Sequence, residues 1–121
     1  VLYMDNLVLD KKFTTSINFF DNILFLDSII NNKNEYNMSV DYLKKDNYYI
    51  LKLNILENET ELINTECKLT NKINGSIVIK NIINLVTDKY NNDLIINVKE
   101  LDEKNNCIKF GKRIYKSKNS A

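Results

Sequence analysis

The stretch VIKNIINLVTDKYNNDLII, residues 78–96, decides how the chain is interpreted, because it fits either one amphipathic helix or a helical turn between two strands. Its apolar residues recur at helical spacing over about two turns, at Ile82, Leu85, Val86 and Tyr90. The polar NND at 91–93 then ends the pattern. A single long helix would carry many Ile, Val and Asn residues, which are weak helix formers. We therefore predict strand, helical turn, strand.

The segment before this stretch carries the strongest turn signal in the chain. Asn74 and Gly75 lie between two flanks that hold apolar residues. An Asn-Gly pair supplies the positive φ angles that both central positions of a type I′ turn require. The sequence therefore predicts a hairpin turn at this pair, followed by a strand through Ile77 and Ile79.

Further apolar runs separated by polar segments indicate short strands, at residues 4–13, 22–30, 48–56, 61–72, 94–101 and 107–117. In the last run Cys107, Lys109, Gly111 and Arg113 alternate with apolar residues, which predicts a strand with one polar face. Seven or eight short strands with one short helical turn are typical of an all-β fold. We expect one domain, residues 1–121, folded as an antiparallel sandwich that resembles a jelly roll.

Composition limits the classes of function. The 121 residues hold 44% apolar residues, which suffices for one core. Lys and Arg number 17 against 16 Asp and Glu, so no nucleic-acid partner is predicted. The basic tail FGKRIYKSKNS, residues 110–120, is the only local cluster of positive charge and is interpreted as a solvated end. No apolar run reaches the length of a membrane span, and the first ten residues do not resemble a signal peptide.

Enzyme chemistry has no visible basis in the sequence. Histidine, the usual general acid or base near neutral pH, is absent. Neither a P-loop, a dinucleotide-binding glycine motif nor a nucleophile elbow is present. We predict a protein without catalytic residues, cofactor or metal site.

The two cysteines, Cys67 and Cys107, are too few and too widely spaced for a structural zinc site. They could form a disulfide, link two subunits, or be two buried thiols. Burial is slightly favoured, because a free cysteine behaves as a small apolar residue.

Four segments, taken in order, resemble DNRLRE domains, which are extracellular β-sandwich modules grouped with certain carbohydrate-binding modules. The segments are residues 18–26, 50–55, 62–69 and 81–90. The sequence departs from that family at Asn81 and Ile83, where Asp and Thr are usual, and it has no Trp. The resemblance implies a jelly-roll module of secreted or surface-displayed proteins, with a stabilising or binding role rather than a hydrolytic one.

These observations predict a non-enzymatic structural or assembly module of a bacterial surface, spore or fibre, located outside the cell or on the cell or spore surface. Its partners would be further copies of itself or other surface proteins. The apolar N-terminal segment is expected to form a strand, through Leu2, Met4, Leu7 and Leu9. This strand either pairs within its own sheet, which is favoured, or adds to a neighbour's sheet edge as an assembly segment.

Two alternative functions remain open at this point. A carbohydrate-binding module would stack sugar rings on exposed tyrosines, with Tyr48 and Tyr49 as candidates and polysaccharide as the partner. Adjacent residues of a strand point to opposite faces, so one of this pair is expected in the core. A viral or phage structural or host-interaction protein fits the composition equally well.

Overall fold

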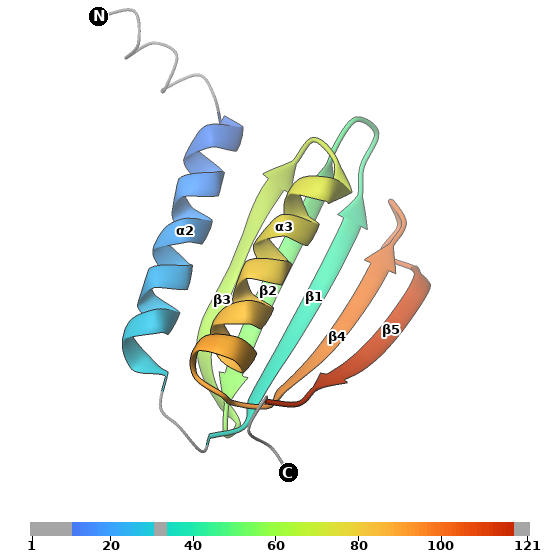
Figure 1. The fold of residues 1–121 in the computed structure, drawn as a ribbon. Coiled ribbons are helices and arrows are strands. Elements are labelled where there is room, and N and C mark those ends of the chain that lie inside the picture. The colour runs from blue at the N-terminus through green and yellow to red at the C-terminus, as the bar shows by residue number, and fades with distance from the viewer. Residues whose placement is uncertain (1–10, 31–33, 118–121) are drawn as a thin grey trace, which may run out of the picture.

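The computed structural model describes residues 11–30 and 34–117. They form one five-stranded sheet with two helices on the same face (Figure 1). Within these ranges no helix is long and apolar enough to cross a membrane. In chain order the elements are α2 (Lys11–Ile29), β1 (Tyr36–Lys44), β2 (Tyr49–Glu57), β3 (Thr60–Leu69), α3 (Lys72–Ile83), its π-helical continuation η1 (Asn84–Lys89), β4 (Leu94–Leu101) and β5 (Cys107–Tyr115).

The strands lie in the order β3-β2-β1-β4-β5. Three neighbouring pairs are antiparallel, whereas β1 and β4 run parallel at the centre of the sheet. A parallel pair needs a long crossover connection, and the chain from β3 through α3 and η1 to β4 supplies it. The outer strands of the sheet are consequently β3 and β5.

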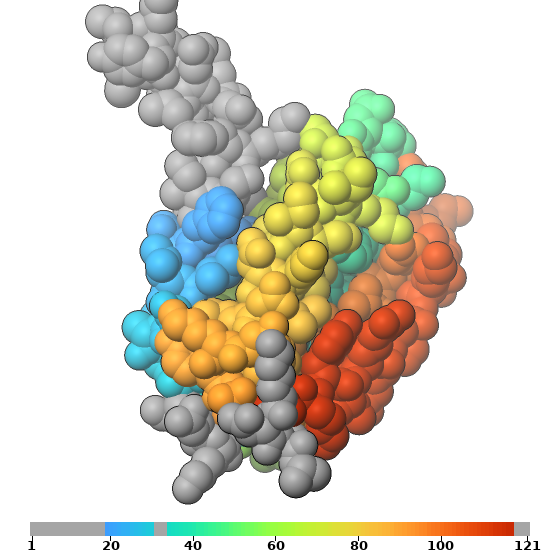
Figure 2. All heavy atoms as spheres, viewed as in Figure 1, coloured from blue at the N-terminus to red at the C-terminus, as the bar shows by residue number. Residues whose placement is uncertain are grey.

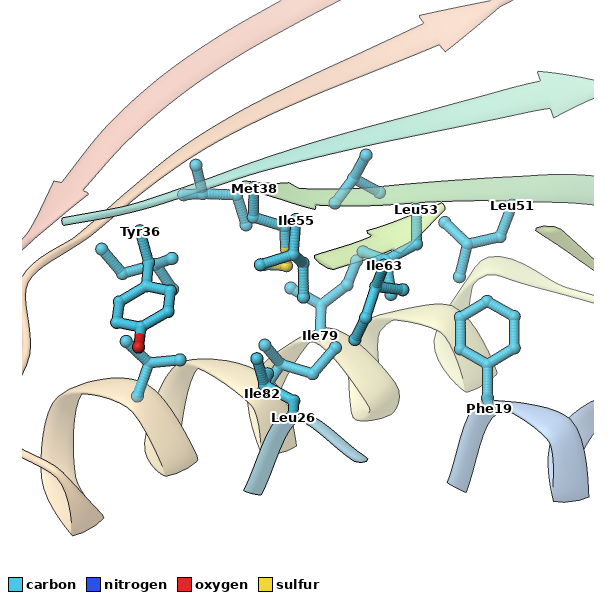
Figure 3. Close-up of a cluster of buried hydrophobic side chains, with 14 of the residues drawn as sticks. Phe19, Leu26, Tyr36, Met38, Leu51, Leu53, Ile55, Ile63, Ile79 and Ile82 are labelled. Carbon is cyan, nitrogen blue, oxygen red and sulfur yellow. The ribbon is translucent and has the colours of Figure 1, made fainter. Parts of the chain in front are cut away.

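The core lies between the sheet and the helices (Figure 3). Alternate residues of the strands face it because side chains of a strand point to opposite sides. In β1 these are Tyr36, Met38, Val40 and Tyr42, all at most 5% exposed. Ile82 and Phe19 pack onto this layer from α3 and α2. Burying such side chains provides the main favourable free energy of folding.

The prediction of strands at residues 4–13 and 22–30 is wrong wherever the structure describes them, because α2 occupies positions 11–29. Its sheet-facing residues are spaced i, i+4, i+7 and i+11, which is the period of a helix, at Phe19, Ile23, Leu26 and Ile30.

The predicted hairpin at Asn74 and Gly75 is also wrong, since both residues lie in the first turn of α3. The strand predicted to follow it through Ile77 and Ile79 is wrong too, because these residues lie within the same helix. The side chain of Asn71 caps this helix by accepting a hydrogen bond from the Asn74 backbone N–H at 3.2 Å. Gly75 serves close packing instead of a turn. An added Cβ there would lie 2.9 Å from the Tyr42 ring.

A two-residue hairpin loop with two positive φ angles does exist, but it joins β2 to β3. Asn58 has φ 48° and Glu59 has φ 74°, the signs that a type I′ turn requires. The strands predicted near β2, β3, β4 and β5 are confirmed, as is the helical character of residues 82–89. The fold is therefore rich in sheet as predicted, with one sheet and two helices among the described residues where seven or eight strands in a sandwich were expected.

Replacing Glu59 with glycine is expected to raise the free energy of unfolding by about 0.5–1 kcal/mol, because glycine adopts a positive φ without a Cβ clash. Chemical denaturation followed by circular dichroism measures this change. Thr60→Gly, in the adjoining strand β3, is the control and is expected to destabilise. A loss of stability in Glu59→Gly would contradict the turn geometry.

Candidate functional site: strand β5 and the groove beside it

Strand β5 is the most exposed element of the sheet. It pairs with β4 on one side and forms the end of the sheet on the other. Its residues from Cys107 to Ile114 are all exposed. Three of them are large and apolar, Ile108, Phe110 and Ile114, each between 56% and 58% exposed. An open edge with exposed apolar side chains can pair with another strand.

The charge on this strand is all of one sign. Lys109, Lys112 and Arg113 lie in β5 and Lys116 follows it, whereas residues 107–116 contain no acidic residue. Lysine on an edge strand discourages pairing with an identical strand. The β5 edge is therefore suited to a partner strand that is acidic.

A groove of about 560 Å³ lies between α3 and the helix-facing side of β4 and β5. Figure 2 places α3 (yellow) beside β5 (red) on this side of the molecule. The apolar part of its lining comes from Ile79 and Ile83 of α3 and from Ile96 and Val98 of β4. The volume falls within the range of small-molecule sites, about 300–1,000 Å³.

Three of the four charged residues that line the groove are cationic. Lys72 of α3 forms an ion pair with Glu100 of β4, so these two charges compensate each other. Lys80 and Arg113 also line the groove, and neither forms an ion pair with a residue of the described ranges. Tyr42 reaches the groove from β1, and burial raises the pKa of its hydroxyl.

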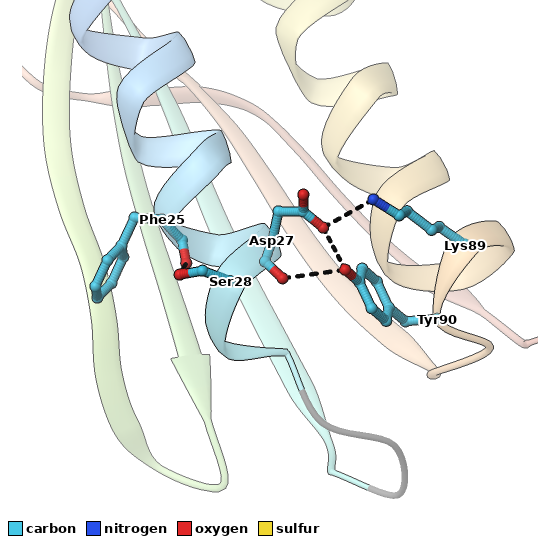
Figure 4. A network of polar contacts seen from close by, with 5 residues as sticks. All are labelled: Phe25, Asp27, Ser28, Lys89 and Tyr90. Carbon is cyan, nitrogen blue, oxygen red and sulfur yellow. Dashed lines mark hydrogen bonds and ion pairs between the residues drawn. The ribbon is translucent and has the colours of Figure 1, made fainter.

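A separate polar cluster joins the two helices (Figure 4). Lys89 Nζ lies 3.0 Å from Asp27 Oδ1, and the Tyr90 hydroxyl hydrogen-bonds to the Asp27 carboxylate and, at 3.1 Å, to its backbone carbonyl oxygen. The hydrogen bond from Tyr90 lowers the pKa of Asp27 and raises that of Tyr90. The cluster connects the end of α2 to the end of η1.

Asp27→Asn is expected to make the stability of the protein less dependent on pH, so that it falls less on acidification than the stability of the parent does. A carboxyl group whose pKa is lowered by folding stabilises the protein above its unfolded pKa of about 3.9, and that stabilisation disappears as the pH falls through the folded pKa. The difference between the melting temperatures at pH 7 and pH 3 should therefore be smaller in the variant. Asp21→Asn, at an exposed acidic residue of the same helix, is the control. Equal differences in both variants would contradict the assigned role of Asp27.

The cysteines lie on the two outer strands, Cys67 on β3 and Cys107 on β5, and both are free. Three strands separate them, so no disulfide joins them within this fold. Cys67 is buried, and burial raises its pKa to about 12. Cys107 is exposed on the open edge, where a link between subunits remains a prediction.

A thiol reagent such as 5,5′-dithiobis(2-nitrobenzoate) is expected to modify one thiol of the native protein rapidly at pH 8. The thiolate is the reactive form, and Cys67 remains a buried thiol at that pH. Cys107→Ser should abolish the rapid phase and leave one thiol that reacts after unfolding. Two rapid thiols in the parent protein would contradict the burial of Cys67.

The remaining candidate residues are dispersed. Tyr49 packs against the core, while Tyr48 is half-buried with Lys68 Nζ 4.3 Å from its ring centroid. The structure thus does not bring the two tyrosines together on one exposed face. The predicted assembly residues Leu2, Met4, Leu7 and Leu9 lie outside the described residues.

Sequence reasoning singled out neither the groove nor the exposed edge. The alternation of residues 107–115 predicted a strand with one polar face, but it did not distinguish an edge from a central strand. Within the described ranges no three His, Cys, Asp or Glu side chains form a metal-binding cluster.

Comparisons of the chain with protein-family models, with curated proteins and with solved structures gave no match. The resemblance to DNRLRE domains therefore stays a prediction. Two of the segments that carry it, residues 18–26 and 81–90, lie in or next to helical elements of this fold.

Proposed function

We propose that the chain is a non-enzymatic assembly module that associates with further copies of itself through the open edge of β5. The observation that carries this proposal is the exposure of Ile108, Phe110 and Ile114 on a strand whose outer edge pairs with no other strand of the described ranges. Addition of a strand to such an edge gives affinity through backbone hydrogen bonds and specificity through alternate side chains.

The charges at the two ends of the sheet support head-to-tail addition. The β5 end carries only cations, whereas the exposed charged residues of the outer strand β3 are Glu61, Glu66 and Lys68, two acids against one base. Pairing β5 of one copy with β3 of the next brings opposite charges together, while β5 against β5 brings like charges together. A contact between two different surfaces produces a ring or an open filament.

A cell-surface, spore or fibre location belongs to the same proposal, because a sheet that continues from copy to copy suits a structural layer or fibre. This location rests on the sequence alone.

The test is size-exclusion chromatography with light scattering over a range of protein concentrations, with and without reductant. The parent protein is expected to form oligomers that grow with concentration. The double variant Ile108→Lys, Phe110→Lys should remain a monomer, because added charge on an edge strand prevents pairing.

The matched control is Ile73→Lys, Ile77→Lys, which changes two isoleucines of α3 that are 69% and 54% exposed. It should assemble like the parent. A parent protein that is monomeric at every concentration would refute the proposal. Oligomers that dissociate under reductant would instead assign the contact to a disulfide of Cys107, and Cys107→Ser would verify this.

A further inference from the structure

The groove between α3 and β5 contains a glycine for which the fold itself provides no reason. The chain has two glycines, and Gly75 is required where α3 approaches Tyr42 and Leu69. Gly111, in the middle of β5, does not have a positive φ, and an added Cβ would meet no atom within 4 Å. The irregularity in the pairing of β4 with β5 lies elsewhere, between Glu100 and Leu101.

A glycine within a strand weakens it and often marks a place where a ligand or another backbone comes close. Gly111 pairs with Val98 of β4, and both residues line the groove. The missing side chain therefore leaves the β5 wall of the groove open at the level of Val98.

The chemistry of the remaining walls indicates what this space would accept. The half-buried Ile83 of α3 and Val98 of β4 offer an apolar surface, and Ile79 and Ile96, which are almost completely buried, lie at its base. Lys80 and Arg113 lie on opposite walls, α3 and β5, and have no ion-pair partner within the described ranges. An arginine and a lysine together bind carboxylate or phosphate oxygens through charge-assisted hydrogen bonds.

We propose that this groove binds a small amphipathic anion, with its apolar body over Gly111, Val98 and Ile96 and its carboxylate or phosphate between Lys80 and Arg113. The site lies on the helix-facing side of β5, to which Gly111 and Arg113 point, whereas Ile108 and Phe110, the residues changed in the assembly test, point to the opposite face. Gel filtration of the same samples therefore reports on assembly separately from ligand binding.

The experiment is a titration of the ¹⁵N-labelled chain, monitored by amide chemical shifts. The probes are octanoate, octyl phosphate, 1-octanol and inorganic phosphate, each below any concentration at which it forms micelles. Octanoate or octyl phosphate should produce saturable shifts at Gly111 and Val98, while α2 is unaffected. The ratio of the affinities for octanoate and octyl phosphate shows whether the groove prefers a carboxylate or a phosphate head group.

Octanol, which lacks the charge, and inorganic phosphate, which lacks the apolar body, should bind at least about tenfold more weakly. Equal affinity for octanol or for inorganic phosphate would overturn the proposal. So would the absence of groove shifts with both octyl anions at millimolar concentrations.

Variants test the residues named. Gly111→Val fills the groove in a strand position where valine is favoured, so it should lose binding by at least about tenfold while its spectrum stays that of a folded protein. Arg113→Gln and Lys80→Gln should each weaken binding of the anions by about tenfold. Lys104→Gln, in the turn between β4 and β5, is the control and should bind as the parent does. Undiminished binding by Gly111→Val would refute the site.

Discussion

Replacing Ile82 with alanine is expected to lower the free energy of unfolding by about 2–5 kcal/mol. The side chain is fully buried between α3 and the sheet (Figure 3). Truncation removes apolar contacts on both sides and leaves a cavity that the rigid sheet cannot fill. Urea denaturation followed by far-ultraviolet circular dichroism measures the change.

The matched control is Ile77→Ala, in the same helix but 54% exposed. Substitutions at exposed sites usually change stability by less than about 0.5 kcal/mol. If both variants lost the same amount of stability, α3 would not face the sheet as described. Ile82→Val should fall between them, at a loss of about 0.5–1.5 kcal/mol.

Gly75→Val is expected to destabilise the protein by about 1–3 kcal/mol, as overpacked cores do. Even the first added atom would lie 2.8 Å from Leu69 Cδ1 and 2.9 Å from the Tyr42 ring. Both neighbours are almost completely buried, so neither can move without disturbing the core. A lower midpoint in the same denaturation experiment is the expected result.

The same substitution at the other glycine supplies the control. Gly111→Val meets open space in a strand, so its stability should equal or exceed that of the parent. A harmless Gly75→Val would show that α3 does not approach the sheet at this point.

Strands β2, β3, β4 and β5 could be predicted because their residues behave locally as strand residues. The central strand β1 was not predicted, although its buried residues recur at alternate positions. Leu51, Leu53 and Ile55 alternate with polar or half-buried positions in β2, and β4 occupies the residues predicted for it, 94–101. Turn chemistry was less reliable. The positive φ angles expected at Asn74 and Gly75 occur instead at Asn58 and Glu59, where the strong turn former Gly is missing.

Helix α2 and the first part of α3 were missed for a different reason, and only the helical character of residues 82–89 was predicted. Ile, Val, Phe and Asn, which dominate α2 and α3, favour strands or turns when each residue is considered alone. Packing against the sheet overrides this preference, because one face of each helix repeats at the helical period. In α3 the buried face consists of Gly75, Ile79 and Ile82. Glycine is not recognised as an apolar position in the sequence, so the helical period is difficult to see.

The candidate site lay beyond sequence reasoning because it depends on which strand is last. In residues 107–115 apolar residues such as Phe110 alternate with polar residues such as Arg113. This pattern suits a central strand as well as an edge strand. The groove needs α3 beside β5, two elements that the long crossover brings together. The cationic character of the segment was visible in the sequence, but its position opposite Lys80 was not.

The parallel pairing of β1 with β4 has a consequence for the order in which the chain can fold. During synthesis β1, β2 and β3 can form a local meander before β4 leaves the ribosome. Until then the edge of β1 that pairs with β4 remains unpaired. Pairs such as Tyr36 with Leu94 close a long loop, which slows folding. Aggregation of the nascent chain, and the need for chaperones, should therefore be greatest for fragments that end before residue 94.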